Sequence, residues 1–333
     1  FNEAQTLPAV MKNMPRSIPG INVIEFQIID DGSTDNTIEV ARELGIHHIV
    51  RVNGRNRRWL GRAFRIGVDH ALAVGADVLV NTDGDNQYPS EMIPTLIEPI
   101  LNGAAQLAIG DRNPGQFAEF SPVKRFLQRL GSHTVAFVTG EDVRDAVCGF
   151  RAYSRKALLS INPITNYTYT VDTLIQAHKK GLDVSWVPIR PNARTRDSRL
   201  ITSLLAKVRK SGATILRLFT IYEPFKTFLA LAALFFIPAL ILLGRFAYFY
   251  LFVPEHATGH VQSVVIGGVF LVIAVQIGVL GIIGDLLSAN RKLIEDGLTR
   301  IRRLETMETE TVSDVTKINT KIEGGSRITN RKQ

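Results

Sequence analysis

A short apolar run leads directly into an acidic loop at residues 77–87, which read Asp77-Val78-Leu79-Val80-Asn81-Thr82-Asp83-Gly84-Asp85-Asn86-Gln87. We predict a strand over residues 77–82 that ends in two aspartates one residue apart. Carboxylates at a strand end can bind a hard divalent cation, which in turn binds a diphosphate. An Asp-x-Asp by itself is weak evidence, because a chain of this length contains roughly one by chance. A solvated turn is therefore the alternative interpretation.

The residues around this loop alternate between strand-like and helix-like segments. Upstream, the apolar run 23–29 ends in a second acidic loop, Asp30-Asp31-Gly32-Ser33. Further strands are predicted over 48–52, 107–110 and 184–189, and helices over 37–44, 60–74 and 92–101. This alternation predicts an α/β domain with a mostly parallel sheet over residues 1–198. Ligands bind at the carboxyl ends of strands in such sheets, and both acidic loops follow predicted strands.

Two long apolar stretches follow this domain. Residues 261–284 contain no charge, and residues 227–253 contain only Arg245. Each stretch reaches the roughly 20 residues that a helix needs to cross a bilayer. Core helices seldom stay apolar on every face for this long, so we predict a transmembrane hairpin over 225–285 rather than two buried helices. Arg245 precedes an aromatic cluster and is expected to reach the interface.

The charges beside the hairpin predict its orientation. The connector 254–260 holds no Lys or Arg. Residues 199–226 carry six Lys and Arg and one acidic residue, Glu223, and so contribute +5 to the chain's net charge of +8. Basic residues also follow the second stretch. Under the positive-inside rule, the connector faces outward, and the α/β domain and both termini are cytoplasmic. We therefore predict a multi-pass cell-membrane protein with two spans.

The segments that flank the hairpin have their own patterns. Residues 199–224 combine apolar residues at helical spacing with Lys and Arg, which predicts an amphipathic interfacial helix on anionic lipid. A basic face can also bind nucleic acid, but the sequence has no nucleic-acid motif and we predict no such partner. In the cytoplasmic helix 286–304, Leu287, Ile294 and Ile301 repeat every seven residues, which is compatible with a homo-oligomer contact. Residues 305–333 are polar and are predicted to be a disordered tail.

The composition and the first residues of the chain exclude several classes of protein and of site. A hydrophobic fraction of 45% over 333 residues excludes a wholly disordered chain. Cys148 is the one cysteine, which excludes a disulfide scaffold and a thiolate metal site. The chain opens at Phe1 without a signal-peptide pattern and enters what looks like a loop after a strand. We therefore expect the first strand of the domain to precede Phe1.

The acidic loops and several later motifs occur in a characteristic order. The set resembles glycosyltransferase family 2, a GT-A (Rossmann-like) fold, and within it the polyprenyl-phosphate sugar transferases similar to dolichyl-phosphate mannose synthase. The resemblance covers residues 1 to about 200, and the hairpin extends it to about 303. The matching pieces are Phe1-Asn2-Glu3, Asp30-Asp31-Gly32-Ser33, Asp83-Gly84-Asp85-Asn86-Gln87, Gly110-Asp111-Arg112, Asp145, Cys148-Gly149-Phe150-Arg151, Pro188 and Ser198-Arg199.

The resemblance implies roles for individual residues. It implies a Mg²⁺ or Mn²⁺ ion on Asp85 and Gln87, and Arg112 near the diphosphate or the acceptor phosphate. Asp145 is implied as a catalytic residue, either as a base or as a support for its loop. The implied nucleotide-sugar pocket consists of Phe1, Glu3, Ile29, Asp31, Asp83 and Gly84, with Asp83 also counted as catalytic. The implied contacts to the acceptor phosphate are Arg151, Arg194, Arg196, Ser198 and Arg199.

Two departures from the family pattern affect the acceptor side. Cys148 stands where the family usually has Ser, which weakens or removes a hydroxyl hydrogen bond. The late motif, Arg194-Thr195-Arg196-Asp197-Ser198-Arg199, is one residue shorter than the family's and lacks its Gly. Arg194 and Arg196 are therefore both candidates for the phosphate contact.

The chemistry of the reaction agrees with these residues. The departing diphosphate gains negative charge, which a metal on Asp85 and nearby Arg side chains would stabilise. A lipid phosphate is largely anionic at neutral pH, so it can attack without a strong base. We predict an inverting transfer of mannose or glucose from a GDP- or UDP-sugar to a polyprenyl phosphate. The alternatives are a same-fold transferase with a hydroxyl acceptor on a glycolipid or glycan, and a non-catalytic nucleotide-sugar-binding membrane scaffold.

Overall fold

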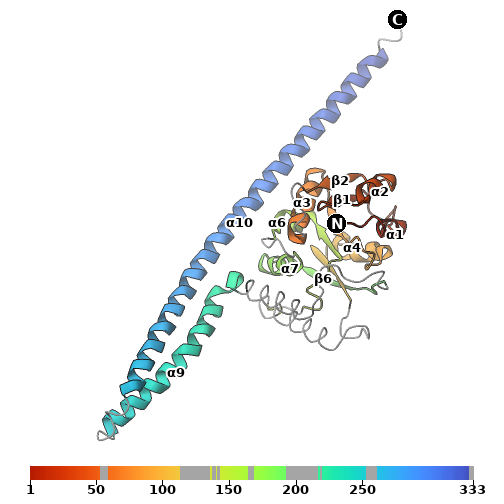
Figure 1. Cartoon of the computed structure of the whole chain (residues 1–333). Coiled ribbons are helices and arrows are strands. Elements are labelled where there is room, and N and C mark those ends of the chain that lie inside the picture. Colours follow the sequence, from red (N-terminus) through yellow and green to blue (C-terminus); the bar gives the residue numbers. More distant parts are fainter. Residues whose placement is uncertain are drawn as a thin grey trace. The chain divides into compact units, whose positions relative to one another are not determined.

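The computed structural model describes residues 1–52, 59–112, 136, 140, 143–163, 169–192, 217, 220–252 and 261–329. The chain divides into two compact units (Figure 1). The first comprises Phe1–Thr202 and Asp296–Gln333, and the second comprises Ser203–Glu295. The sheets and the acidic loops belong to the first unit.

The first unit is built on two sheets. Its described strands are β1 (Gln27–Asp30), β2 (His48–Arg51), β3 (Val78–Asn81), β4 (Leu107–Asp111), β5 (Arg151–Ser154) and β6 (Val184–Pro188). β1 and β2 pair in parallel, and the other four strands lie in the order β3-β5-β4-β6. β4 and β6 are parallel, whereas β5 runs antiparallel to both of its neighbours. The predicted α/β class is confirmed, and the sheet is mixed because of β5.

Helices cover these sheets. They are α1 (Leu7–Lys12), α2 (Thr37–Glu43), α3 (Leu60–Ala73), the 3-10 turn η1 (Ser90–Met92), α4 (Ile93–Leu101), α6 (Arg155–Ser160) and α7 (Thr170–Lys179). α3 packs on β1, and α4 and α6 pack on the larger sheet. On α3, Phe64, Val68, Ala71 and Leu72 are buried, which is the helical spacing of one apolar face.

Helices α1, α6 and α7 were not predicted, and two strands also differ from the sequence-based expectation. β1 begins at Gln27 instead of residue 23, and Val23 is 71% exposed, so an apolar side chain alone does not extend the strand. β5 was not predicted as a strand. Its residues Arg151, Ala152 and Tyr153 are all buried, so it lacks the polar-apolar alternation that marks a half-exposed strand.

The β4 strand determines the position of Arg112, a predicted site residue. Leu107, Ala108 and Ile109 have no exposed surface, so the strand lies in the centre of the core. Next along the strand, a Cβ at Gly110 would lie 2.7 Å from Cδ1 of Ile189. A larger residue here would have to displace the Ile189 side chain, so glycine lets the end of β4 pack closely against the segment after β6. Arg112 follows directly from this end.

The second unit is a helical hairpin of α9 (Pro224–Phe252) and the first part of α10 (Val261–Thr329). Both helices are long and apolar enough to cross a membrane, over Pro224–Phe252 and Val261–Thr306. They lie side by side (Figure 1), and glycines of α10 face α9. A Cβ at Gly267 would lie 3.0 Å from Leu243, and one at Gly284 would lie 2.9 Å from Pro224. The outward side chains are exposed Leu, Ile, Val and Phe, as lipid-facing residues would be.

The last described element is α10, which continues to Thr329 through most of the segment 305–333 that was predicted to be a disordered tail. No proline follows Pro254, and a helix that is already formed adds residues at little cost, so polar composition alone does not end it. Within the first unit, Arg302 of α10 forms an ion pair of 3.0 Å with Asp69 of α3. Most of the predicted interfacial helix lies outside the described residues.

Candidate active site

The N-terminal segment is fixed on the loop that follows β1. The backbone N–H of Asn2 donates to Oγ of Ser33 at 3.0 Å, and the N–H of Glu3 donates to Oγ1 of Thr37 at 2.9 Å. Asn2 itself has a positive φ of 55°, which turns the chain at this point. Two motifs about 30 residues apart in sequence, 1–3 and 30–33, therefore form one wall of the site.

The acidic loop, residues 83–88, lies beside this wall. A Cβ at Gly84 would lie 3.3 Å from Cγ of Glu3, so the glycine lets the two segments meet. The pKa of Asp83 is raised to about 6, mainly by burial and also by the charges of Asp85 and Glu3, while the charge of Arg112 lowers it. Asp83 therefore lies within electrostatic reach of two other carboxylates and one guanidinium.

The acidic loop suits a hard divalent cation by the chemistry of its donors. Among the described residues, no group of three or more His, Cys, Asp or Glu side chains is placed to hold a metal. Mg²⁺ and similar ions, however, typically use one or two carboxylates and complete their shell with water and substrate phosphates. Asp85 and Gln87 offer a carboxylate and an amide oxygen close to the carboxylate of Asp83. The residues fit the implied ion.

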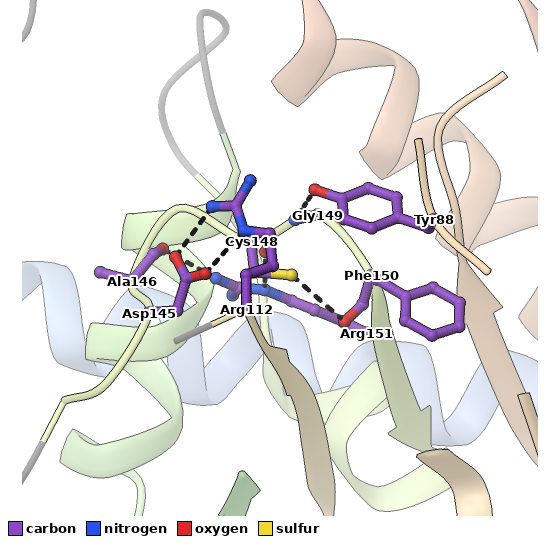
Figure 2. A network of polar contacts seen from close by, with 8 residues as sticks. All are labelled: Tyr88, Arg112, Asp145, Ala146, Cys148, Gly149, Phe150 and Arg151. Carbon is purple, nitrogen blue, oxygen red and sulfur yellow. Dashed lines mark hydrogen bonds and ion pairs between the residues drawn. The ribbon is translucent and has the colours of Figure 1, made fainter. Parts of the chain in front are cut away.

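Arg112 and Asp145 form an ion pair at the end of β4 (Figure 2). Nε of Arg112 donates to Oδ2 of Asp145 at 2.7 Å, and Nη2 donates to Oδ1 at 2.9 Å. The Asp145 side chain has no exposed surface, whereas 16% of Arg112 is exposed. Burial lowers the pKa of Arg112, but the bonds and charge of Asp145 outweigh it, so the guanidinium stays charged. Both oxygens of Asp145 are thus bound to Arg112, which favours a supporting role over that of a base.

Arg151 lies beneath the same loop and is fully buried (Figure 2). Its guanidinium donates to the carbonyl oxygens of Cys148 at 2.7 Å, Ala146 at 2.8 Å and Thr170 at 2.6 Å, and to Oγ1 of Thr173 at 2.9 Å. Arg151, predicted as a contact to the acceptor phosphate, thus makes these bonds to the protein and has no exposed surface. The side chain points into the core from β5 and ties the 146–151 loop to α7.

Cys148 and Gly149 contact the acidic loop from this side. The Gly149 N–H donates to the hydroxyl of Tyr88 at 2.8 Å, and the amide of Asn81 donates to the Gly149 carbonyl at 2.9 Å. A Cβ at Gly149 would lie 3.4 Å from both carboxylate oxygens of Asp83. Burial raises the pKa of Cys148 to about 11, so its thiol stays neutral beside Arg112.

Sequence reasoning missed Tyr88, Asn81 and Tyr169. Their hydroxyl and amide groups form hydrogen bonds that hold Gly149 in place. These residues belong to no recognised motif, and an aromatic residue after an acidic loop is ordinarily interpreted as part of the hydrophobic core. Asp31 and Ile29 lie half-buried at the end of β1, next to a buried Asp30 whose Oδ1 accepts the Ser33 N–H at 3.0 Å. The predicted residues Arg194, Arg196, Ser198 and Arg199 lie outside the described part of the chain.

A family model and individual relatives of known name both match this chain, and they indicate the same family. The family described as glycosyl transferase family 2 matches residues 1–161. Polyprenol monophosphomannose synthase of Mycolicibacterium smegmatis is 31% identical over 198 residues, which cover 57% of this chain and 73% of that protein. UDP-N-acetylglucosamine--dolichyl-phosphate N-acetylglucosaminyltransferase of Methanococcus voltae is 28% identical over 201 residues, covering 54% and 80%.

Solved structures agree on the fold. Glucosyl-3-phosphoglycerate synthase from Mycobacterium tuberculosis in complex with uridine diphosphate superposes with a TM-score of 0.51 at 25% identity, over 65% of this chain and 76% of that one. The same enzyme with Mn²⁺, uridine diphosphate and glucosyl-3-phosphoglycerate gives 0.51 at 22% identity, over 66% and 76%. At this identity, the second match supports the fold alone.

Proposed function

The chain belongs to glycosyltransferase family 2, and on this basis we propose that it transfers one hexose from a nucleotide sugar to a polyprenyl phosphate at a membrane. The observation that carries the proposal is that Glu3, Asp85 and Arg112 all act on the buried carboxylate of Asp83, around which a diphosphate and its cation would bind. The names of the relatives support a polyprenyl acceptor. Two helices able to cross a membrane support anchoring beside that acceptor.

The donor would lie between the 1–3 segment, the end of β1 and the acidic loop. Phe1, Glu3, Ile29 and Asp31 form the proposed nucleotide side, with Asp83 and Gly84 below the ribose and diphosphate. GDP- and UDP-sugars both remain candidates for this pocket. The two relatives described above are named for mannose and N-acetylglucosamine, so the sugar is a matter for direct assay.

Asp85 and Gln87 would hold Mg²⁺ or Mn²⁺ against the diphosphate. When bound, the cation supplies charge neutralisation to the leaving group. The pair with Asp145 uses Nε and Nη2 of Arg112. Nη1 would donate charge-assisted hydrogen bonds to the diphosphate. Because Asp145 holds the guanidinium through two bonds, the donor nitrogens are oriented before substrate arrives, which is the condition for electrostatic catalysis.

The acceptor phosphate would attack without help from a protein base. A phosphate monoester has its second pKa near ~6 and is largely a dianion at neutral pH. One in-line displacement with no covalent intermediate inverts the sugar carbon. Arg194, Arg196, Ser198 and Arg199 are the proposed contacts to this phosphate. They lie at the start of the basic segment and before the hairpin, and these two segments would keep the catalytic unit on the cytoplasmic membrane face.

The experiment uses the full chain in detergent with polyprenyl phosphate, Mg²⁺ or Mn²⁺, and radiolabelled GDP- and UDP-sugars. The readout is label extracted into organic solvent. We expect one donor to give metal-dependent label, and Asp85→Asn to lower the rate roughly 100-fold or more, because a ligand carboxylate is lost.

Asp183→Asn makes the same chemical change at an exposed position after α7 and should keep the wild-type rate. Equal rates for Asp85→Asn and wild type would refute the metal assignment. Absence of lipid-soluble label with every donor, from folded wild-type protein, would refute the polyprenyl acceptor.

A further inference from the structure

Asn192 lies four residues beyond β6 and contacts the acidic loop. Its backbone N–H donates to the carbonyl of Gln87 at 2.9 Å. Its side-chain Nδ2 donates to the carbonyl of Asn86 at 3.1 Å and to that of Tyr88 at 3.4 Å. One residue thus binds three successive carbonyl groups of the loop.

These contacts fall where the loop is most constrained. Asn86 has a φ of 58°, in the left-handed region, and it lies between Asp85 and Gln87. The left-handed conformation costs a non-glycine residue roughly 1 kcal/mol or more, although asparagine tolerates it better than most. A turn held in this way fixes the directions in which Asp85 and Gln87 leave the backbone.

The loop has a matching internal bond. Oδ1 of Asp85 accepts the N–H of Gln87 at 3.1 Å, so the two proposed ligands are already linked across Asn86. Rotation of the peptide between Asn86 and Gln87 would break this link together with the bond from Asn192 to the Asn86 carbonyl. The orientation of the two ligands and the position of Asn192 are therefore coupled.

From this geometry, we propose that Asn192 is a positioning residue for the divalent-cation site, holding the turn at Asn86 so that Asp85 and Gln87 point at one ion. The inference rests on the proposed function, since it takes Asp85 and Gln87 as the metal ligands. Asn192 does not itself touch the ion or the sugar. It acts through three backbone carbonyls, as outer-shell partners commonly do in metal sites.

The test measures metal binding directly. Free Mn²⁺ is followed by electron paramagnetic resonance as the full chain in detergent is titrated, with UDP or GDP present. Asn192→Ala removes both side-chain donors and keeps the backbone N–H. We expect its Mn²⁺ affinity to fall about 10-fold or more, which is the usual effect of losing an outer-shell partner. Asn192→Leu keeps the side-chain volume without the donors and should show the same loss.

Asn13→Ala is the matched control, because Asn13 is exposed at the end of α1. It should bind Mn²⁺ as wild type does. In the transfer assay, Asn192→Ala should raise the Mn²⁺ concentration needed for half-maximal rate by a similar factor. It should leave KM for the polyprenyl phosphate within about twofold, and a general loss of packing would not separate the two constants in this way.

The outcomes distinguish this inference from the proposed function. If Asp85→Asn loses Mn²⁺ while both Asn192 variants bind it like wild type, the positioning role is wrong and the metal site stands. If Asp85→Asn binds Mn²⁺ like wild type, the metal assignment fails and the inference fails with it. Weaker Mn²⁺ binding in both Asn192 variants, with normal binding in Asn13→Ala, supports the proposal.

Discussion

At the scale of single residues, the site depends on which charged side chains are bound by other protein groups and which keep a surface for the substrate. Arg112 and Asp145 bind through two hydrogen bonds, and Arg151 uses its guanidinium on the backbone around Cys148. Of these two arginines, Arg112 alone keeps exposed side-chain surface to offer a substrate. Because Asp145 is buried and paired in this way, we propose that it positions Arg112 and does not act as a base.

This assignment predicts the behaviour of Asp145→Asn. The variant removes the charge that balances a largely buried guanidinium, and breaking such a pair typically costs ~3–5 kcal/mol. We expect kcat to fall by roughly 100-fold because Arg112 loses its orientation. The shape of the pH–rate profile should not change, since no proton passes through Asp145. Steady-state rates between pH 5.5 and 9 would measure both effects.

Arg112→Lys serves as the companion variant, because it keeps the charge and loses the two-pronged geometry. It should lower kcat to a similar degree with the same pH profile. Loss of one limb of the profile in Asp145→Asn alone would instead identify Asp145 as the base and favour a hydroxyl acceptor.

At the scale of elements, the hairpin relies on small residues where its helices meet. Ala232 and Ala239 of α9 and Ala274 of α10 are buried, in contrast to the exposed Leu and Val around them. Gly281 lies in the same contact, since a Cβ there would sit 3.0 Å from Cβ of Phe228. Helices in lipid associate through close packing of this kind, because burial of apolar surface gives little gain there.

Gly281→Leu should therefore separate α9 from α10. We expect a destabilisation of ~1–3 kcal/mol, the usual cost of overpacking. The thermal midpoint in detergent, followed by far-ultraviolet circular dichroism, would report it. Gly278→Leu is the matched control on the same helix, because nothing lies within 4 Å of a Cβ there. An equal shift in both variants would count against the packing explanation.

At the scale of the whole molecule, the charge pattern around the hairpin predicts which side of the membrane each part occupies. The connector 254–260 lacks Lys and Arg, while both flanks are basic. We expect His256→Cys to react with a membrane-impermeant maleimide added to intact cells. Asn13→Cys, exposed on the catalytic unit, should react only after lysis. The native Cys148 is buried and should contribute little label. The reverse labelling pattern would overturn the cytoplasmic placement.

The sequence by itself determined the family, the α/β class and the two apolar helices. Each of these follows from a local sequence pattern. The patterns are acidic residues directly after apolar runs, helical periodicity over residues 60–74, and about 20 uncharged residues in succession. Local patterns also placed Asp83, Asp85 and Gln87 together, because they share one loop. The resemblance added Glu3 and Arg112, which the structure brings near that loop.

The tertiary structure decided how these residues are used. Nothing in the motif Cys148-Gly149-Phe150-Arg151 says that Arg151 turns inward, since burial depends on β5 lying between β3 and β4. The pairing of Arg112 with Asp145 joins residues 33 positions apart, and the Asn192 bonds join segments more than 100 apart. Such contacts depend on which strands become neighbours, and a local pattern carries no information about that.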